Sequence, residues 1–470
     1  MQQVYKKLAL SGTITDEQEA SVVAWIREFL SDLLATYLGG PCFALAFQQL
    51  SVMANIMDTD SETHPRSQRR LGVILELLDE MGYLKDKDAL HVEKELCSWR
   101  DEVTGSLEAI PPKGDDHPRL RLLEKPMREF MRHVVTKYCD DRSLQPFKRE
   151  LFASVVPGFV DQLRSGVPPF KQDRAKRGFR SPLPAVFNAA WEAVLFKNSA
   201  LFEEFSPIER TNRLMALQTL SGLAFKGIQS SEVVRLWDEE AVLRTQDQTP
   251  SPPEPSSSGI PNSAMLTEAE VRRRLALEPK EGKLVMTPLL DSRQVGEGSV
   301  NLRLGTNFIV TRAADLPSFK PHQFGEDEIR QCQEHVAKNC GDVFVLHPRR
   351  LILAATLEYI ALPDDLAALV LSRSSFGRLG LIVATAAFVH PGWKGCLTLE
   401  LSNAADIPIE LLCGSPIAQL VLFRADKLAR VVKDFPPDRR LYPTSPEFSP
   451  LSAAPDWKNL LAISERLKKL

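Results

Sequence analysis

The sequence predicts a multidomain chain in which an N-terminal all-α part precedes a C-terminal all-β part with a small helical insertion. Three observations support this prediction. Apolar residues recur every three or four positions in the front part, short runs rich in Val, Ile, Leu and Thr follow from Val300 onward, and a Pro/Ser-rich stretch lies between them. A chain of 470 residues also exceeds what one core usually holds. We therefore expect an α-helical domain over 1–245, a linker over 246–264 and a second domain over 265–470.

The front part contains amphipathic helical patterns. Residues 21–38 place their apolar side chains on one face, and the Gly39–Gly40–Pro41 run is expected to end this helix. The same periodicity predicts helices over 69–84 and 233–245. The linker is predicted from Thr249 to Ser263, which is too polar and too rich in proline to form a core.

The back part opens with one expected helix and continues with expected strands. Thr267 precedes Glu270 by three residues, a capping-box pattern that predicts a helix over 266–277. A helical insertion is expected over 326–340. Gly, Pro, Asn and Asp separate short apolar runs typical of an all-β sandwich or barrel, and these runs cover residues 300–310, 342–347, 351–362, 367–372, 381–389, 396–403, 407–412 and 416–423.

Composition excludes several classes of protein. Lys and Arg number 58 against 61 Asp and Glu, so nothing indicates a dedicated nucleic-acid binder. No apolar run is long enough to span a membrane. The seven scattered cysteines are typical of reduced thiols. We expect a cytoplasmic protein with no membrane or nucleic-acid partner.

Missing motifs exclude further chemistry. The chain lacks the glycine-rich nucleotide-binding motifs, the G-x-S-x-G nucleophile motif and any Cys-x-x-Cys pair. Zinc-dependent nucleobase deaminases need an H-x-E followed by P-C-x-x-C to hold their metal. That route is therefore closed to this chain.

Two polar clusters lie amid the expected strands. Residues 372–381 combine arginines, serines and glycines, which suits an anion such as a phosphate, although a plain polar turn fits the same residues. Glu400 lies within an apolar strand, where Leu397, Leu399 and Leu401 should share the opposite face. A carboxylate at such a position often faces only water, so neither cluster defines a function alone.

Taken together, these stretches resemble the dCTP deaminase branch of the dUTPase-like superfamily. The resemblance runs from about Thr267 to Phe423, and more loosely to the end of the chain. It is carried by GSVNLRLG, TLEYIALPDDL, SRSSFGRLGL, HPGWKGCLTLELSN and GSPIAQLVLF in the family's order and spacing. It implies a β-clip or jelly-roll-like barrel that forms a homotrimer, with active sites shared between neighbouring subunits.

The resemblance also implies a reaction and its residues. Water attacks C4 of the cytosine of dCTP, ammonia leaves and dUTP forms without zinc. Glu400 matches the carboxylate that shuttles protons, and burial beside the pyrimidine should raise its pKa. Ser374 and Arg378 match the groups that position the water. Arg373, Ser375 and Gln419 match positions that hold the triphosphate, with Mg²⁺ carried on the nucleotide.

Some residues depart from the family pattern. Asn301 stands where relatives carry Asp, while Phe388 and His390 replace an Arg and an Asp near the sugar and base. His390 equally fits a turn histidine that bonds to backbone. The loss of that Asp argues against dUTPase activity, which is the weaker alternative. Residues 441–457 replace the lysine-rich lid of the family.

The front part resembles the trailing part of helical zinc-peptidase-like domains, in which Glu28 would match a third metal ligand. The H-E-x-x-H motif that supplies the other ligands is missing. We therefore expect a scaffold or interaction domain that binds an unknown protein. The alternative to an enzyme is a nucleotide-binding sensor that reports to this domain, for example in phage defence or stress regulation.

Overall fold

The computed structural model describes residues 16–53, 64–84, 91–109, 133–170, 182–195, 210–244, 264–277, 282–312, 331–385, 387–425 and 446. Apart from Ala264 and Pro446, the expected linker and the segment 441–457 lie outside these ranges. The chain forms two compact units, the first comprising Met1–Ser165 and Ser181–Arg213, the second Gly166–Arg180 and Leu214–Leu470. Among the helices of the described ranges, none is apolar over a length that could cross a bilayer.

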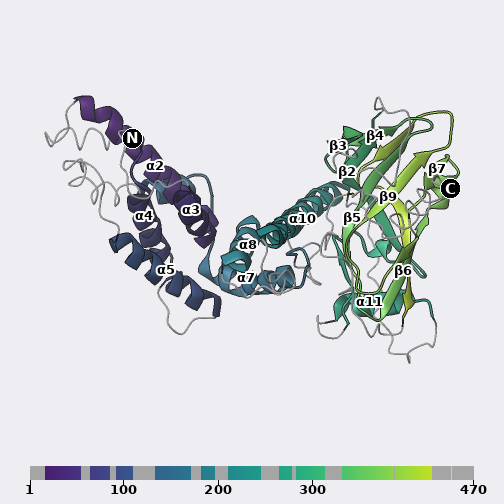
Figure 1. Ribbon diagram of the computed structural model, residues 1–470, viewed down its shortest axis with the longest axis horizontal. Coiled ribbons are helices and arrows are strands. Elements are labelled where there is room, and N and C mark those ends of the chain that lie inside the picture. The colour runs from purple at the N-terminus through teal and green to yellow at the C-terminus, as the bar shows by residue number, and fades with distance from the viewer. Residues whose placement is uncertain are drawn as a thin grey trace, which may run out of the picture. The chain divides into compact units, whose positions relative to one another are not determined.

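The first unit consists of helices (Figure 1). They are α2 (Asp16–Gly39), α3 (Pro41–Met53), α4 (Ser67–Glu80), α5 (His91–Ala109), α7 (Arg149–Arg164) and α8 (Leu183–Leu195). Phe29 and Leu33 of α2 pack with Val73 of α4 in a buried cluster. As expected, α2 ends at the Gly39–Gly40–Pro41 run. Gly40 has a φ of 69° and lies so close to Phe147 that a Cβ would clash, so glycine is required there.

The second unit contains helix α10 (Arg210–Arg244) from Leu214 onward, helix α11 (Glu268–Ala276) and the strands. The strands are β1 (Val285–Thr287), β2 (Val300–Thr311), β3 (Gln333–Ala337), β4 (Val343–Leu346), β5 (Leu351–Ala361), β6 (Leu366–Ser372), β7 (Leu381–Val383), β8 (Phe388–Val389), β9 (Lys394–Asn403), β10 (Ile409–Leu412) and β11 (Pro416–Arg424). The division therefore falls earlier in the chain than the boundary expected near residue 245, because most of α10 belongs with the strands.

The strands pair antiparallel throughout the described residues. The main sheet has the order β7-β9-β5-β2-β11-β6-β8, with β1 beside β5 and β3 beside β2, and β4 pairs separately with β10. Its inward side chains form one core that includes Leu302, Phe308, Leu399 and Leu420. The expected division into an α-helical region and an antiparallel β region is confirmed.

One expected element is wrong over its second half. Of the helix expected over 326–340, residues 326–330 lie outside the described residues and Gln331 is helical. Residues Gln333–Ala337 are instead a strand, which pairs with the outer half of β2 through Phe308 opposite Val336 and Ile309 opposite His335. Strand β2 extends far enough to offer free backbone groups, and this segment uses them. A local helical pattern is overridden here by a long-range partner.

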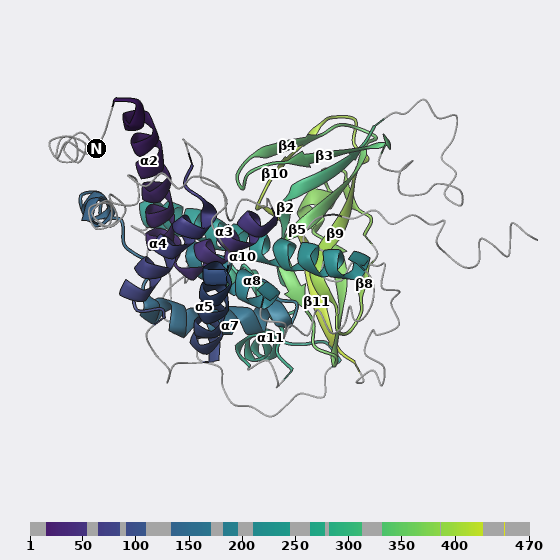
Figure 2. The same cartoon turned by 60° about the vertical axis from the view of Figure 1, so that its left-hand side comes forward.

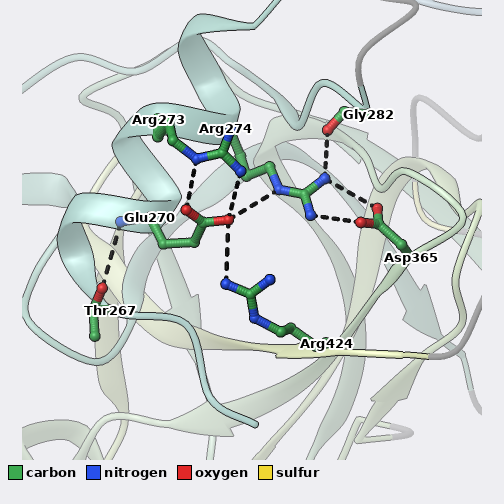
Figure 3. A network of polar contacts seen from close by, with 7 residues as sticks. All are labelled: Thr267, Glu270, Arg273, Arg274, Gly282, Asp365 and Arg424. Carbon is green, nitrogen blue, oxygen red and sulfur yellow. Dashed lines mark hydrogen bonds and ion pairs between the residues drawn. The ribbon is translucent and has the colours of Figure 1, made fainter. Parts of the chain in front are cut away.

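Helix α11 is fixed to the β fold by a network of charged side chains (Figure 3). Thr267 caps the helix as expected, because its side chain accepts a hydrogen bond from the Glu270 amide at 3.4 Å. Glu270 binds Arg273 and Arg274, with N–O distances of 2.7 and 3.2 Å. Arg274 also forms two hydrogen bonds to Asp365 in the turn between β5 and β6. These contacts hold the turn against the helix.

Replacing Glu270 by Gln should destabilise the second unit. The hydrogen bonds from Arg273, with those from Arg274, lower the pKa of Glu270 below 4.5. Its stabilisation is therefore present above the unfolded-state pKa and is lost as the pH falls through the lower, folded value. We expect a loss of about 2 kcal/mol at pH 7 that shrinks towards pH 3, measured by urea unfolding of the full chain followed through the far-ultraviolet signal.

The matched control is Glu268→Gln, which breaks only the half-exposed pair with Arg272 on the same helix. Such a pair contributes about 0.5 kcal/mol. Equal losses for the two variants, or a Glu270 effect that does not depend on pH, would contradict the role of the network.

Candidate active site

The polar cluster expected at 372–381 forms the corner between β6 and a short helix, α13 (Ser374–Gly377). Arg373 precedes this helix, and its Nη1 donates a hydrogen bond of 3.0 Å to Oδ1 of Asn301 on β2. Ser374, Ser375 and Arg378 are exposed. The corner therefore presents two hydroxyls and two guanidinium groups, a donor set suited to an anion.

Strand β11 brings a further expected site residue to this corner. Gln419 lies opposite Asn301 of β2 on one side and opposite Leu371 of β6 on the other. Gln419, Asn301 and Arg373 thus come from three neighbouring strands and strand ends. These three residues are brought to the same corner within a single chain.

Glu400 lies on β9, on the face that was expected. Leu399 and Leu401 are fully buried, while Glu400 is only half-buried, so the carboxylate points away from the core. The strand is held in place here by its neighbour: the Glu400 amide donates to Thr385 Oγ1 at 3.1 Å, and its carbonyl accepts from the Ala384 amide at 2.8 Å.

Glu400 is not bonded to Ser374 or Arg378, the residues expected to position water, within the described part of one chain. Among the described residues, no hydrogen bond or ion pair joins Glu400 to Ser374 or Arg378. The chain does lead from one to the other, since α13 runs into β7, which pairs with β9 and places Val383 opposite Leu401. The carboxylate and the α13 side chains therefore lie on connected elements without direct bonding.

Phe388 and His390 project together at the edge of the sheet. Val389 between them is buried, so both rings lie on the outward side of β8. The rings meet edge to face with centroids 4.9 Å apart, and Phe388 is 51% exposed. The His390 carbonyl accepts a hydrogen bond from the Trp393 amide at 3.2 Å, which closes a turn through the backbone of His390. The imidazole ring takes no part in that bond and is exposed. Trp393 is partly buried and packs against the core.

A buried carboxylate behind this corner was missed from the sequence. Glu358 on β5 is fully buried, accepting from Gln294 Nε2 at 2.6 Å and from the Arg303 amide at 2.9 Å. Burial raises its pKa to about 7, against the opposing effect of the Arg303 and Lys226 charges. An acidic residue inside the apolar run LEYIAL was the available signal.

In the first unit, Glu28 pairs with an arginine. Its Oε2 lies 2.7 Å from Arg70, which also binds buried Asp32, and its Oε1 lies 3.5 Å from His64. Burial raises the pKa of Asp32 while Arg70 opposes the rise. Within the described residues, no three His, Cys, Asp or Glu side chains gather as metal ligands. The carboxylates here are occupied by a structural ion-pair network.

Comparison with known proteins identifies the class to which this barrel belongs. A family described as dCTP deaminase-like matches residues 265–425. A relative from Methanobrevibacter smithii, called "dCTP deaminase, dUMP-forming", is 39% identical over 159 residues, covering 34% of this chain and 79% of the relative. A "dCTP deaminase" from Haloarcula marismortui is 42% identical over 158 residues, covering 33% and 78%. The chain belongs to the dCTP deaminase-like family through this segment.

Among solved structures, the chain is similar to a 2'-deoxycytidine 5'-triphosphate deaminase from Agrobacterium tumefaciens. The identity is 25% and the TM-score 0.28, over 34% of this chain and 48% of that one. The matched family segment contains the corner at α13, Glu400 and Gln419, but neither the first unit nor α10.

Proposed function

We propose that the C-terminal barrel deaminates dCTP hydrolytically, without zinc, to give dUTP and ammonia. The observation that carries this proposal is membership of the dCTP deaminase-like family over the segment that contains Glu400, Ser374 and Arg378. The Arg373–Asn301 hydrogen bond supports it, because that contact orients a guanidinium at the exposed corner beside those residues.

The proposed chemistry is general acid–base catalysis. Glu400 takes a proton from water as the oxygen bonds to C4 of cytosine, and delivers it to the ring nitrogen N3. It then takes the second proton from the new C4 hydroxyl and delivers it to the amino group, which leaves as ammonia as the C4 carbonyl forms. Ser374 and Arg378 hold the water and its developing negative charge. Arg373, Ser375 and Gln419 bind the triphosphate, which brings its own Mg²⁺.

We propose a homotrimer as the active form, acting in the cytoplasm. Glu400 does not contact Ser374 or Arg378 within the described part of one chain, so a neighbouring subunit could supply the missing half of each site. Exposed apolar side chains lie on β6, β7, β8 and the turn after α13, and they support burial of these segments in an assembly: Leu371, Ile382, Phe388 and Leu379.

The product follows from one replacement. His390 stands where the resemblance places an Asp that activates water in dUTPases and bifunctional enzymes. Relatives carry both printed names, dCTP deaminase and its dUMP-forming form. We propose that this chain stops at dUTP, because an imidazole replaces the carboxylate that would start diphosphate release.

The direct test incubates the full chain with dCTP and Mg²⁺, separates the nucleotides by chromatography and measures ammonia. We expect dUTP and ammonia in equal amounts at about one turnover per second or faster. Formation of dUMP would overturn the product assignment. The outward Phe388–His390 pair favours a second candidate, a nucleotide sensor, and tight dCTP binding with no product would favour that function over the enzyme.

A further inference from the structure

Helix α10 lies beside the strands of the second unit (Figures 1 and 2) and is bonded to them through a buried lysine. Lys226 is only 4% exposed, and its Nζ donates to the Leu357 carbonyl of β5 at 2.5 Å and to Gln229 Oε1 at 3.1 Å. Gln229, one turn further along, donates to Thr306 Oγ1 of β2 at 2.7 Å. The helix is therefore bonded to two neighbouring strands at once.

These bonds fall where the two strands lose their regular pairing. The register between β2 and β5 shifts between Leu304 and Phe308, and that between β5 and β9 shifts between Ala355 and Tyr359. Such irregularities leave backbone carbonyls in need of donors. Lys226 supplies one of these donors, to Leu357.

A buried ammonium is costly unless an opposite charge lies near it. Glu358, the residue after Leu357, provides that charge, and the electrostatic effect of Lys226 on it lowers the pKa that burial raises. The other ionisable groups that face this pair are Arg303 of β2 and the Cys396 thiol of β9. Burial raises the pKa of that thiol, so it stays neutral near pH 7.

The carboxylate of Glu358 leads to the candidate site in two hydrogen bonds. Its Oε1 accepts from Nε2 of Gln294, whose second Nε2 hydrogen is donated to the Asn301 carbonyl at 3.0 Å. The side chain of Asn301 in turn accepts from Arg373. Gln294 is buried, so water does not compete for these bonds.

We propose that Lys226 is a positioning residue: through its bond to the Leu357 carbonyl it holds the β5 backbone at the next residue, Glu358, whose buried carboxylate fixes Asn301 and Arg373 through Gln294 to receive the nucleotide triphosphate. The identity of the nucleotide rests on the proposed function. Lys226 lies outside the segment matched by the family, whereas Glu358, Asn301 and Arg373 lie inside it. The link therefore connects α10 to the family segment.

The test compares Lys226→Met with Gln229→Ala in the full chain. Both variants remove a bond that anchors α10, but only the first removes the charge beside Glu358. We expect faster hydrogen exchange in Lys226→Met over 300–305 and 371–378, and unchanged exchange there in Gln229→Ala. This measurement requires no nucleotide, so it stands even if dCTP is not the substrate.

Nucleotide affinity provides the second readout. A protonated Glu358 has one oxygen acting as a donor, so it loses one of its two bonds from Gln294 and the Arg303 amide. Affinity for dCTP should therefore weaken as the pH falls through about 7. Removing the Lys226 charge should move this midpoint to higher pH and weaken the Kd about tenfold at pH 7.5, which is about 1.4 kcal/mol. Lys226→Arg should restore much of the loss.

Further outcomes decide the proposal. If Lys226→Met does not fold, Glu358→Gln replaces it, and exchange should rise over the same residues with no midpoint near pH 7 in the affinity. Equal effects of Lys226→Met and Gln229→Ala, or no change over 371–378 in either charge variant, would overturn the proposal. Binding without deamination in the wild type would overturn the proposed enzyme while leaving the positioning role intact.

Discussion

Replacing Glu400 by Gln is expected to slow dCTP deamination about 10²- to 10⁴-fold, the range by which a positioned acid–base group contributes. The amide retains the size of the side chain and its half-buried place on β9, but it cannot accept a proton from water. The loss should therefore fall on kcat, with the Kd for dCTP within about threefold of the wild type.

Glu410→Gln is the matched control for this change. Glu410 is an exposed strand glutamate on β10, opposite Val345 and away from the corner at α13. Its replacement should leave the rate unchanged. A Glu400→Gln protein that releases ammonia at the wild-type rate would remove Glu400 from the proposed mechanism, whereas a wild-type chain that releases no ammonia would remove the enzyme proposal.

Replacing Arg378 by Met is expected to lower kcat about 10²- to 10³-fold, as the loss of one preorganised donor to developing charge does in other enzymes. Arg378 is exposed at the end of α13, and no hydrogen bond or ion pair to another described side chain engages it. Its guanidinium is therefore available for a water or a substrate. Steady-state kinetics together with equilibrium dCTP binding would separate the two roles.

Arg312→Met is the control, because the exposed Arg312–Glu334 pair lies at the far end of β2. It should change neither kcat nor Kd. If Arg378→Met instead weakened dCTP binding and left kcat intact, Arg378 would be assigned to the triphosphate, and the positioning of water would require another donor.

Local sequence patterns predict a helix or strand well where the residues of that segment alone determine its structure. The helix of α2 follows from its apolar stripe and its terminal glycines, and β9 follows from the alternation around Glu400. Strand β3 could not be predicted in this way, because its cause is a partner strand some 25 residues earlier in the chain, β2, whose outer half extends beyond its pairing with β11.

Some residues of the candidate site could likewise be predicted from the sequence, and others could not. Arg373, Asn301 and Gln419 were assigned through family resemblance, and the fold brings them together because β2, β11 and β6 are adjacent. The roles of Glu358 and Lys226 could not be predicted from the sequence, because Glu358 is a single charged residue in an apolar run and Lys226 is a single charged residue in a helical run. Only their burial at irregular strand pairing gives them a role, and residue spacing does not encode that burial.

The docking of α10 also changes where the smallest self-sufficient piece of this protein should begin. A fragment that begins at residue 265 would retain the segment matched by the family. It would lose the Lys226 donor to the Leu357 carbonyl, and the Trp237 ring that lies 4.7 Å from the Arg303 guanidinium. In such a fragment, these two polar groups would lose the partners that α10 supplies. The segment that matches the family and the segment that folds as one unit are therefore different stretches of sequence, so a transferred family segment should include α10.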